Sequence, residues 1–226
     1  MPYEKHMPYF IVLEAMETEK GCPLCGLERK ELRHYFDTML DDSVSNPSFR
    51  HELVKAKGFC GRHGDMLLDF KQGLGISILY LDQVKLFLKE IDGTFSKMPS
   101  SFFGKKPDGW KSGSACPACE MQLGARRRHI SVFISSLGEK QMRSVYEQSP
   151  GFCVPHFNEV FRHGKPNTEA RNFIISVQKE KFKKLEAELE EFCRKKDYRF
   201  SGEEKGTEAD SWKRAVKMMT GDSTLF

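Results

Sequence analysis

The hydrophobic positions of this chain recur at the three- and four-residue spacing of α-helices, and no segment alternates as a half-buried β-strand does. In the first half, the pattern predicts a helix that follows Cys25 and ends at the turn of Asn46 and Pro47, and further helices through about residue 56, over residues 60–70 and over residues 75–91. In the second half, it predicts helices over residues 119–136, 139–148, 153–162, 168–196 and 209–219. The sequence therefore indicates an all-α protein.

Two of these helices carry a more specific expectation. Residues 75–91 are apolar on nearly all sides, which predicts a helix at the centre of the core. In the long helix over residues 168–196, an apolar seam steps by three, four and three residues through Phe182, Leu185, Leu189 and Phe192. Because Cys193 lies beside this seam, we expect its thiol to be buried as a small hydrophobic group.

A Cys-Pro-x-Cys pair followed by Gly-Phe-Cys-x-x-His occurs twice in the chain. The first copy contains Cys22, Cys25, Cys60 and His63, and the second contains Cys116, Cys119, Cys153 and His156. The offset between the copies is 94 residues from Cys22 to Cys116 and 93 residues from Cys60 to Cys153. Such an offset is typical of an internal repeat that has gained or lost one loop residue.

Three thiols and one imidazole complete a tetrahedral ligand set for Zn²⁺. A disulfide framework has no use for a histidine at the same place in both copies, so the motif favours metal over disulfides. Two zinc ions per chain are expected, and an iron–sulfur cluster with one histidine ligand is the alternative. A site with four protein ligands has no open position for water or substrate, which favours a structural role.

The repeat also predicts how the chain is organised. Residues 1–93 form the first helical repeat and residues 115–226 form the second, each pinned by its own Cys₃His site, as parts of one integrated unit. Each metal would then close a loop of about forty residues. Residues 94–114, rich in Ser, Gly and Lys, form the linker, and its aromatic residues are expected to contact the body. These are Phe102, Phe103 and Trp110.

Each cysteine motif is expected to begin a helix, where unpaired backbone N–H groups stabilise a thiolate. Proline after the first cysteine suits the first helical turn, which needs no donor there. Three thiolates and a neutral histidine leave a charge of −1 around Zn²⁺, and Arg62 and Arg29 are candidates to offset it.

Composition narrows the classes of function. The 226 residues carry a net charge of +4, and the pI of about 8.6 is lower than that of a dedicated nucleic-acid binder. No apolar run is long enough for a membrane span, and the N-terminal residues lack the apolar stretch of a secretory signal, so we expect a cytoplasmic protein. The densest basic run is a candidate contact for an anion or a partner; it consists of Arg126, Arg127 and Arg128.

The ordered segments CPLCGLE, GFCGRH, CPACE, GFCVPHF and LEAELEEFCRKKDYRF resemble a bacterial family of uncharacterised proteins, domain of unknown function 6062. The resemblance covers most of the chain, from YFIVLEAMET to DSWKRAVKMMTG. It implies one all-helical unit with paired Cys/His sites, and it implies that the C-terminal tail packs back on the body. It implies no established activity.

No paired-carboxylate, Ser/His/Asp or phosphate-loop signature is present, so the sequence favours a protein without catalytic activity. The leading hypothesis is a zinc-stabilised helical interaction or adaptor protein with an unidentified protein partner. The alternatives are a thiol-based redox or metal-responsive protein, an iron–sulfur protein, and a nucleic-acid-binding protein. The sequence leaves the oligomeric state open.

Overall fold

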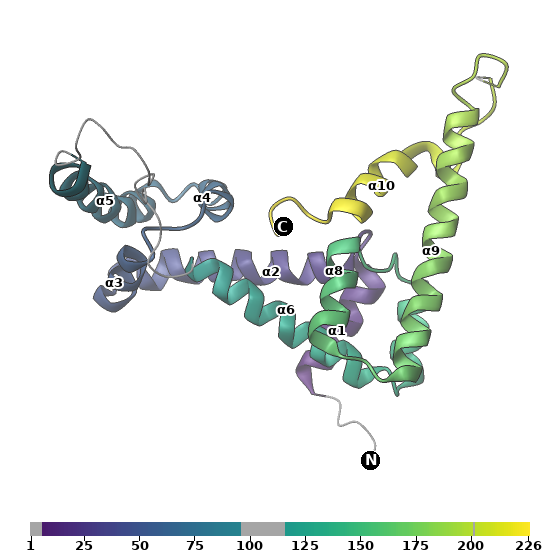
Figure 1. Ribbon diagram of the computed structural model, residues 1–226, viewed down its shortest axis with the longest axis horizontal. Coiled ribbons are helices and arrows are strands. Elements are labelled where there is room, and N and C mark those ends of the chain that lie inside the picture. Colours follow the sequence, from purple (N-terminus) through teal and green to yellow (C-terminus); the bar gives the residue numbers. More distant parts are fainter. Residues whose placement is uncertain (1–5, 96–115, 201) are drawn as a thin grey trace, which may run out of the picture. The chain divides into compact units, whose positions relative to one another are not determined.

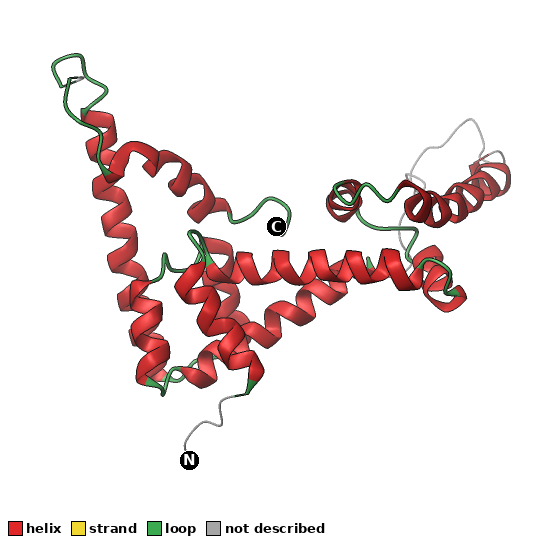
Figure 2. Ribbon diagram, turned by 180° about the vertical axis from the view of Figure 1, so that it is seen from behind, coloured by secondary structure: helices red, strands yellow, loops and turns green. Residues whose placement is uncertain are grey.

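The computed structural model describes residues 6–95, 116–200 and 202–226, and every regular element among them is helical (Figures 1 and 2). The prediction of an all-α protein is therefore confirmed. None of the described helices combines the length and the apolar character that a membrane crossing requires. The α-helices are α1 (Met7–Thr18), α2 (Pro23–Thr38), α3 (Pro47–Lys55), α4 (Gly61–Leu68), α5 (Gly73–Glu90), α6 (Pro117–Ser136), α7 (Lys140–Gln148), α8 (Val154–Glu159), α9 (Thr168–Arg194) and α10 (Ser211–Thr220).

Shorter helical turns extend several of these elements. Three are π-helical, at Met39–Ser43, Ile91–Phe95 and Val160–Gly164, and one is a 3₁₀ turn at Thr207–Asp210. The predicted helices match α2 to α10. Helix α1 was not predicted, although its buried residues include Tyr9, Val12, Leu13 and Met16, which follow helical spacing.

The chain divides into two compact units that do not coincide with the two sequence repeats. The first unit combines residues Met1–Lys30 with Ala125–Phe226, and the second consists of Glu31–Gly124. The boundaries fall inside α2 and α6, so each of these helices contributes one end to each unit. Most of the predicted linker, with Phe102, Phe103 and Trp110, lies outside the described residues.

An aromatic cluster forms the core of the first unit. Phe133, Tyr146 and Phe152 are completely buried, and their ring centroids are 5.0 Å apart in each pair. Gln178 on α9 is buried beside them. Its amide nitrogen donates to the carbonyl oxygen of Phe152 at 2.8 Å, and its amide oxygen accepts from the backbone N–H of Phe152 at 3.0 Å. This pair of hydrogen bonds fixes the backbone directly before Cys153.

The second unit packs around Phe36 on α2, whose ring lies 5.4 Å from Phe59 and 5.6 Å from Phe70. Helix α5 belongs to this unit, and the expectation that it is central to the core is wrong. Its buried residues are Leu79 and Gln83. The pattern showed that α5 is apolar, but a pattern does not show how many of its faces find a packing partner. Apolar side chains left exposed on it and on the turn that follows include Leu74, Leu81, Val84, Leu88 and Ile91.

Cys193, near the end of α9, is exposed rather than buried. The apolar seam is only partly covered, because Leu185 is buried whereas Phe182, Leu189 and Phe192 are half-buried. Because the seam is only partly covered, the Cys193 side chain beside it faces solvent. The prediction of a buried Cys193 is wrong for this reason.

Candidate metal centres

All four cysteine motifs begin a helix, as their sequences predict. Cys60 and Cys153 are the N-cap residues of α4 and α8, with nearly identical extended backbone angles. Cys22 and Cys116 directly precede Pro23 and Pro117, the first residues of α2 and α6. In each motif, the carbonyl oxygen of the first cysteine accepts a hydrogen bond from the backbone N–H four residues later, which forms the first helical turn.

The helix starts bring the predicted ligands together in two groups. Cluster 1 consists of Cys22, Cys25, Cys153 and His156, and cluster 2 consists of Cys60, His63, Cys116 and Cys119. Within each cluster, the ligand atoms all lie within 4.8 Å of one another. Each cluster lies inside one compact unit, cluster 1 in the first and cluster 2 in the second.

The pairing of the motifs differs from the prediction. Each Cys-x-x-Cys pair joins the Cys-x-x-His pair of the other sequence repeat, whereas the sequence order suggested that each repeat holds its own site. The reason is the division of the chain: α2 begins in the first unit beside α8, and α6 begins in the second unit beside α4. A metal in cluster 1 would link Cys25 to Cys153, which are 128 positions apart. Closing such a loop costs the unfolded chain about 1 kcal/mol more entropy than closing forty residues.

In cluster 1, Nδ1 of His156 lies 3.4 Å from Sγ of Cys22 and 3.3 Å from Sγ of both Cys25 and Cys153. The sulfurs of Cys25 and Cys153 are 3.7 Å apart. This separation is far longer than the roughly 2.05 Å of a disulfide bond. The four atoms thus surround a central space without being bonded to one another.

Cluster 2 has the same geometry. Nδ1 of His63 lies 3.3 Å from the sulfurs of Cys60 and Cys119 and 3.6 Å from that of Cys116. The sulfurs of Cys60 and Cys119 are 3.7 Å apart. In tetrahedral zinc with ordinary bond lengths, the edges are about 3.8 Å between thiolates and about 3.6 Å between thiolate and imidazole. Both clusters therefore fit a single metal ion of this kind.

The N-cap cysteines of α4 and α8 are held toward the thiolate form, whereas burial raises the pKa of Cys22 before α2. The thiols of Cys22 and Cys25, together with the backbone N–H of His156, lower the pKa of Cys153 to about 4. Burial raises the pKa of Cys60, but the backbone N–H of His63 and the neighbouring thiols outweigh it and lower that pKa. Cysteine binds metal as the thiolate, so the lowered pKa values of Cys60 and Cys153 favour metal binding at both helix starts.

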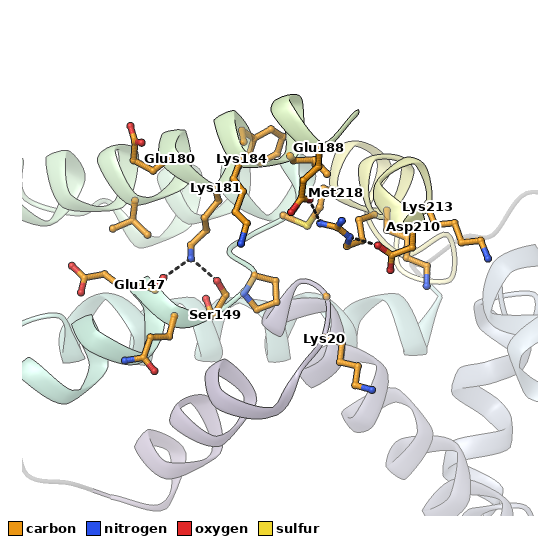
Figure 3. Close-up of a pocket in the computed structure, with 18 of the residues that line it drawn as sticks. Lys20, Glu147, Ser149, Glu180, Lys181, Lys184, Glu188, Asp210, Lys213 and Met218 are labelled. Atoms are coloured by element: carbon orange, nitrogen blue, oxygen red, sulfur yellow. Dashed lines mark hydrogen bonds and ion pairs between the residues drawn. The ribbon is translucent and has the colours of Figure 1, made fainter. Parts of the chain in front are cut away.

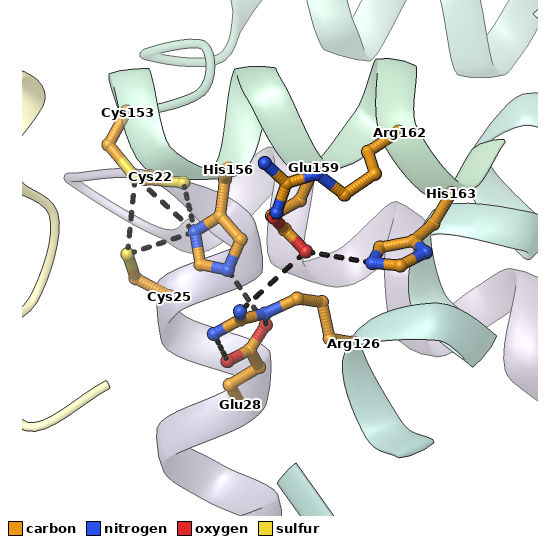
Figure 4. Close-up of polar contacts among 9 residues, drawn as sticks. All are labelled: Cys22, Cys25, Glu28, Arg126, Cys153, His156, Glu159, Arg162 and His163. Atoms are coloured by element: carbon orange, nitrogen blue, oxygen red, sulfur yellow. Dashed lines mark hydrogen bonds and ion pairs between the residues drawn. The ribbon is translucent and has the colours of Figure 1, made fainter. Parts of the chain in front are cut away.

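Glu28 supports cluster 1 from outside the ligand set (Figure 4). Nε2 of His156 lies 2.7 Å from Oε1 of Glu28. Arg126 donates from Nε and Nη2 to the two oxygens of the same carboxylate, at 2.7 and 2.8 Å. Burial alone would raise the pKa of Glu28, but these partners lower it from 4.5 to about 2. A carboxylate that holds the second nitrogen of a histidine is a common support of metal ligands, because it fixes the ring orientation and tautomer.

The C-terminal tail also contacts this group, as the family resemblance implied. The Phe226 ring packs edge-on against the His156 ring, with centroids 4.8 Å apart. The Arg126 guanidinium lies 4.4 Å from the centroid of the Phe226 ring. Asp222 accepts a hydrogen bond from Arg29 at 2.6 Å. The tail thus covers cluster 1 and the Glu28–Arg126 pair.

Sequence reasoning missed Glu28 as a supporting residue, although a signal was present. Glu28 lies three residues after Cys25 on the same helix, so the two side chains share one face. The sequence also predicted that Arg126, Arg127 and Arg128 contact an anion or a partner. The Arg126 side chain instead pairs with Glu28 inside the first unit, whereas Arg127 and Arg128 are exposed.

The two clusters differ in their surroundings. All four residues of cluster 1 are buried, whereas Cys60 and Cys119 of cluster 2 are partly exposed. Gln122, which is 94 positions after Glu28, takes the corresponding place in cluster 2 and offers a neutral amide. Burial and the charge of Arg62 lower the pKa of His63 to about 4, and the nearby Gln122 side chain opposes this only in part. Cluster 2 therefore lacks the carboxylate–arginine support of cluster 1.

The fold and these clusters define an all-helical protein with two Cys₃His groups that could each hold a metal ion. The chain matches the model of a family described as "Family of unknown function (DUF6062)" over residues 5–225, and it belongs to that family. It is 27% identical over 207 residues to the "Uncharacterized 23.9 kDa protein in xynA 3'region" of Caldicellulosiruptor sp. (strain Rt8B.4). That alignment covers 90% of this chain and 96% of the relative. No solved structure matches the chain.

Proposed function

We propose that this protein is a zinc-stabilised helical adaptor, in which two structural zinc sites hold the fold and the surface binds a protein partner. The observation that carries the proposal is the pair of complete Cys₃His sets, with the ligand atoms of each within 4.8 Å of one another. Four protein ligands saturate zinc and leave no place for substrate. The metals would therefore act on folding, and we propose no catalytic activity for them. The free thiols of all six ligand cysteines suit a reducing compartment such as the cytoplasm.

The spacing of the ligands supports zinc over an iron–sulfur cluster. Several iron and sulfide atoms would have to fit between the ligands of such a cluster, and the ligand atoms would then stand farther apart. Sulfur separations of 3.7 Å in both groups instead match the edge of a tetrahedron around one ion. The buried Glu28–His156 contact also supports a single zinc ion, because it fixes the orientation of a histidine ligand.

The interaction role rests on exposed apolar surface. Leu81, Val84, Leu88 and Ile91 follow one another at helical spacing and are all exposed. Contiguous exposed apolar residues on a folded protein commonly mark an interaction surface. The case for nucleic-acid binding weakens because Arg126 is neutralised by Glu28 rather than presented to solvent.

The test is elemental analysis of protein purified without chelator or added metal, followed by removal of the metal. We expect two zinc ions per chain, no visible absorbance band, and loss of helical circular dichroism and of partner binding when a strong chelator removes the zinc. Full helicity and unchanged partner binding in the metal-free protein would contradict the proposal. Iron with sulfide and a broad band near about 400 nm would replace it with an iron–sulfur protein.

A second candidate function is thiol-based redox sensing at cluster 2. It is favoured by the partly exposed sulfurs of Cys60 and Cys119, which lie 3.7 Å apart. Hydrogen peroxide would accept two electrons from these two thiolates and two protons from solvent, which gives one disulfide and two water molecules. The metal would then leave the cluster. Retention of both zinc ions after mild peroxide treatment would exclude this candidate.

A further inference from the structure

The first unit contains a pocket of about 900 Å³ that none of the metal ligands lines (Figure 3). Helices α9 and α10 form two of its walls. The segment after α7, including Ser149 and Pro150, forms another, and the turn at Lys20 and Gly21 completes it. Its volume falls in the range of pockets that hold small organic molecules.

The pocket has an apolar lining from three different segments. Val177, Phe182 and Leu185 extend from α9, Met218 from α10, and Pro150 from the segment after α7. Leu185 and Met218 are buried, so they form a fixed floor rather than a mobile rim. Such a lining suits the apolar body of a ligand.

Some charged side chains of the pocket already have partners. Arg214 donates to the carboxylates of Glu188 at 2.5 Å and Asp210 at 2.7 Å. Lys181 donates to the carbonyl oxygens of Glu147 and Ser149 (Figure 3). These interactions hold α9 against α10 and against the segment after α7. They therefore shape the pocket.

Three further lysines of the pocket are available to a ligand. Within the part of the chain that the structure describes, Lys20, Lys184 and Lys217 form no ion pair or hydrogen bond. Figure 3 shows the Lys184 side chain extending from α9 toward the segment that carries Ser149. Six basic and four acidic side chains line the pocket in total, so its charge is net positive.

We propose that this pocket binds an amphipathic anion, which is a molecule with an apolar body and a carboxylate or phosphate group at one end. The body would pack on Leu185 and Met218, and Lys184 would bind the anionic group. Lysine suits this role because its ammonium is a compact charge on a flexible stem, which can follow either type of head group. The site is separate from the metal clusters and extends the function beyond the proposed adaptor role.

The test is isothermal titration calorimetry on the full chain with zinc bound. Decanoate and decyl phosphate are the probes, both kept below the concentration at which they form micelles. Decanol and inorganic phosphate test the two halves of the ligand separately. We expect one or both amphipathic anions to bind at least about tenfold more tightly than either half, and their relative affinities identify the head group.

Three variants assign the binding to the pocket. Lys184→Met removes one charge but keeps most of the stem, and Ser176→Trp fills the pocket from α9. Lys179→Met is the matched control, because Lys179 is exposed on the same helix but does not line the pocket. We expect about tenfold weaker binding in the first two and unchanged binding in the control.

Circular dichroism and zinc content should be the same in all three variants, which excludes a folding effect. Absence of binding by both anions, equal binding of decanol, or wild-type affinity in both Lys184→Met and Ser176→Trp would overturn the proposal.

Discussion

Nε2 of His156 and Oε1 of Glu28 lie 2.7 Å apart, and both side chains are almost completely buried. This contact places the ring proton on Nε2 and turns Nδ1 toward the three thiols of cluster 1. Cluster 2 has Gln122 at the corresponding position and partly exposed sulfurs. The two sites are therefore built alike in their ligands but differently in what surrounds them, and several measurable differences follow.

Glu28→Gln should lower the zinc affinity of cluster 1 by about 10- to 100-fold. The reason is that a neutral amide holds the orientation and tautomer of the His156 ring less firmly than a charged carboxylate does. Competition with a chromogenic chelator measures this change. The same substitution removes the bidentate partner of Arg126 and leaves it only the longer ion pair with Glu159 at 3.8 Å, which should reduce the free energy of unfolding by up to about 3 kcal/mol.

The double variant Glu28→Gln/Arg126→Met separates these two effects. It removes both charges, so it should recover most of the stability while the zinc affinity of cluster 1 stays low. Gln122→Glu is the matched control at cluster 2 and should not weaken zinc binding there. Wild-type zinc affinity in Glu28→Gln would show that the contact does not support the metal.

Two pairs of serine substitutions distinguish the observed pairing from pairing in sequence order. Cys22→Ser/Cys153→Ser alters only cluster 1, so this protein should retain one zinc ion per chain. Cys22→Ser/Cys60→Ser alters both clusters, so it should retain none. Pairing in sequence order predicts the reverse result. Elemental analysis of the soluble monodisperse fraction decides between them, because one zinc ion retained in Cys22→Ser/Cys153→Ser fits only the observed pairing.

Zinc should leave cluster 2 before cluster 1 when a chelator is added in excess. Cys60 and Cys119 are partly exposed, whereas all ligands of cluster 1 are buried. A ligand-exchange reaction starts most readily at a sulfur that the chelator can reach. Stopped-flow absorbance of the chelator complex should therefore show a fast and a slow phase of equal amplitude.

The assignment of these phases is tested by single variants. Cys60→Ser should abolish the fast phase and Cys153→Ser the slow one. A single phase in the wild-type protein, or loss of the slow phase in Cys60→Ser, would contradict the predicted order.

Gly151→Ala should destabilise the protein more than Gly58→Ala, with zinc present in excess. Both glycines have positive φ, +82° and +89°, so alanine at either should cost about 1–2 kcal/mol of backbone strain. At Gly151, the added Cβ would also lie 2.6 Å from Cδ of Lys181, whereas at Gly58 the nearest atom, Cγ of Gln83, is 3.8 Å away.

Urea unfolding measures this difference, and we expect it to be about 1 kcal/mol or more, because Lys181 must give up hydrogen bonds to move. Gly138→Ala is the control, since nothing lies within 4 Å of its added Cβ and its φ is not positive. Its free energy of unfolding should change by less than about 0.5 kcal/mol. If Gly58→Ala and Gly151→Ala reduced the free energy of unfolding equally, the contact with Lys181 would not contribute to the cost at Gly151.

Local features were predictable from the sequence, whereas burial was not. Asn46 and Pro47 mark the start of α3, and the structure shows the Asn46 side chain accepting from the backbone N–H of Ser48 at 2.9 Å. A cap of this kind depends on adjacent residues only. The exposure of Cys193 and the exposed face of α5 depend instead on which other segments pack there, and periodicity does not contain that information.

The sequence by itself determined the helical class, the helix starts and the eight residues of the Cys/His motifs, because spacing and turn chemistry are local properties. The tertiary structure decided how the motifs combine. Each Cys-x-x-Cys pair is chemically able to complete either Cys-x-x-His pair, so ligand chemistry alone does not choose between them. The packing of α2 beside α8 in one unit, and of α6 beside α4 in the other, makes that choice. It also places Glu28 on His156, a contact between residues 128 positions apart.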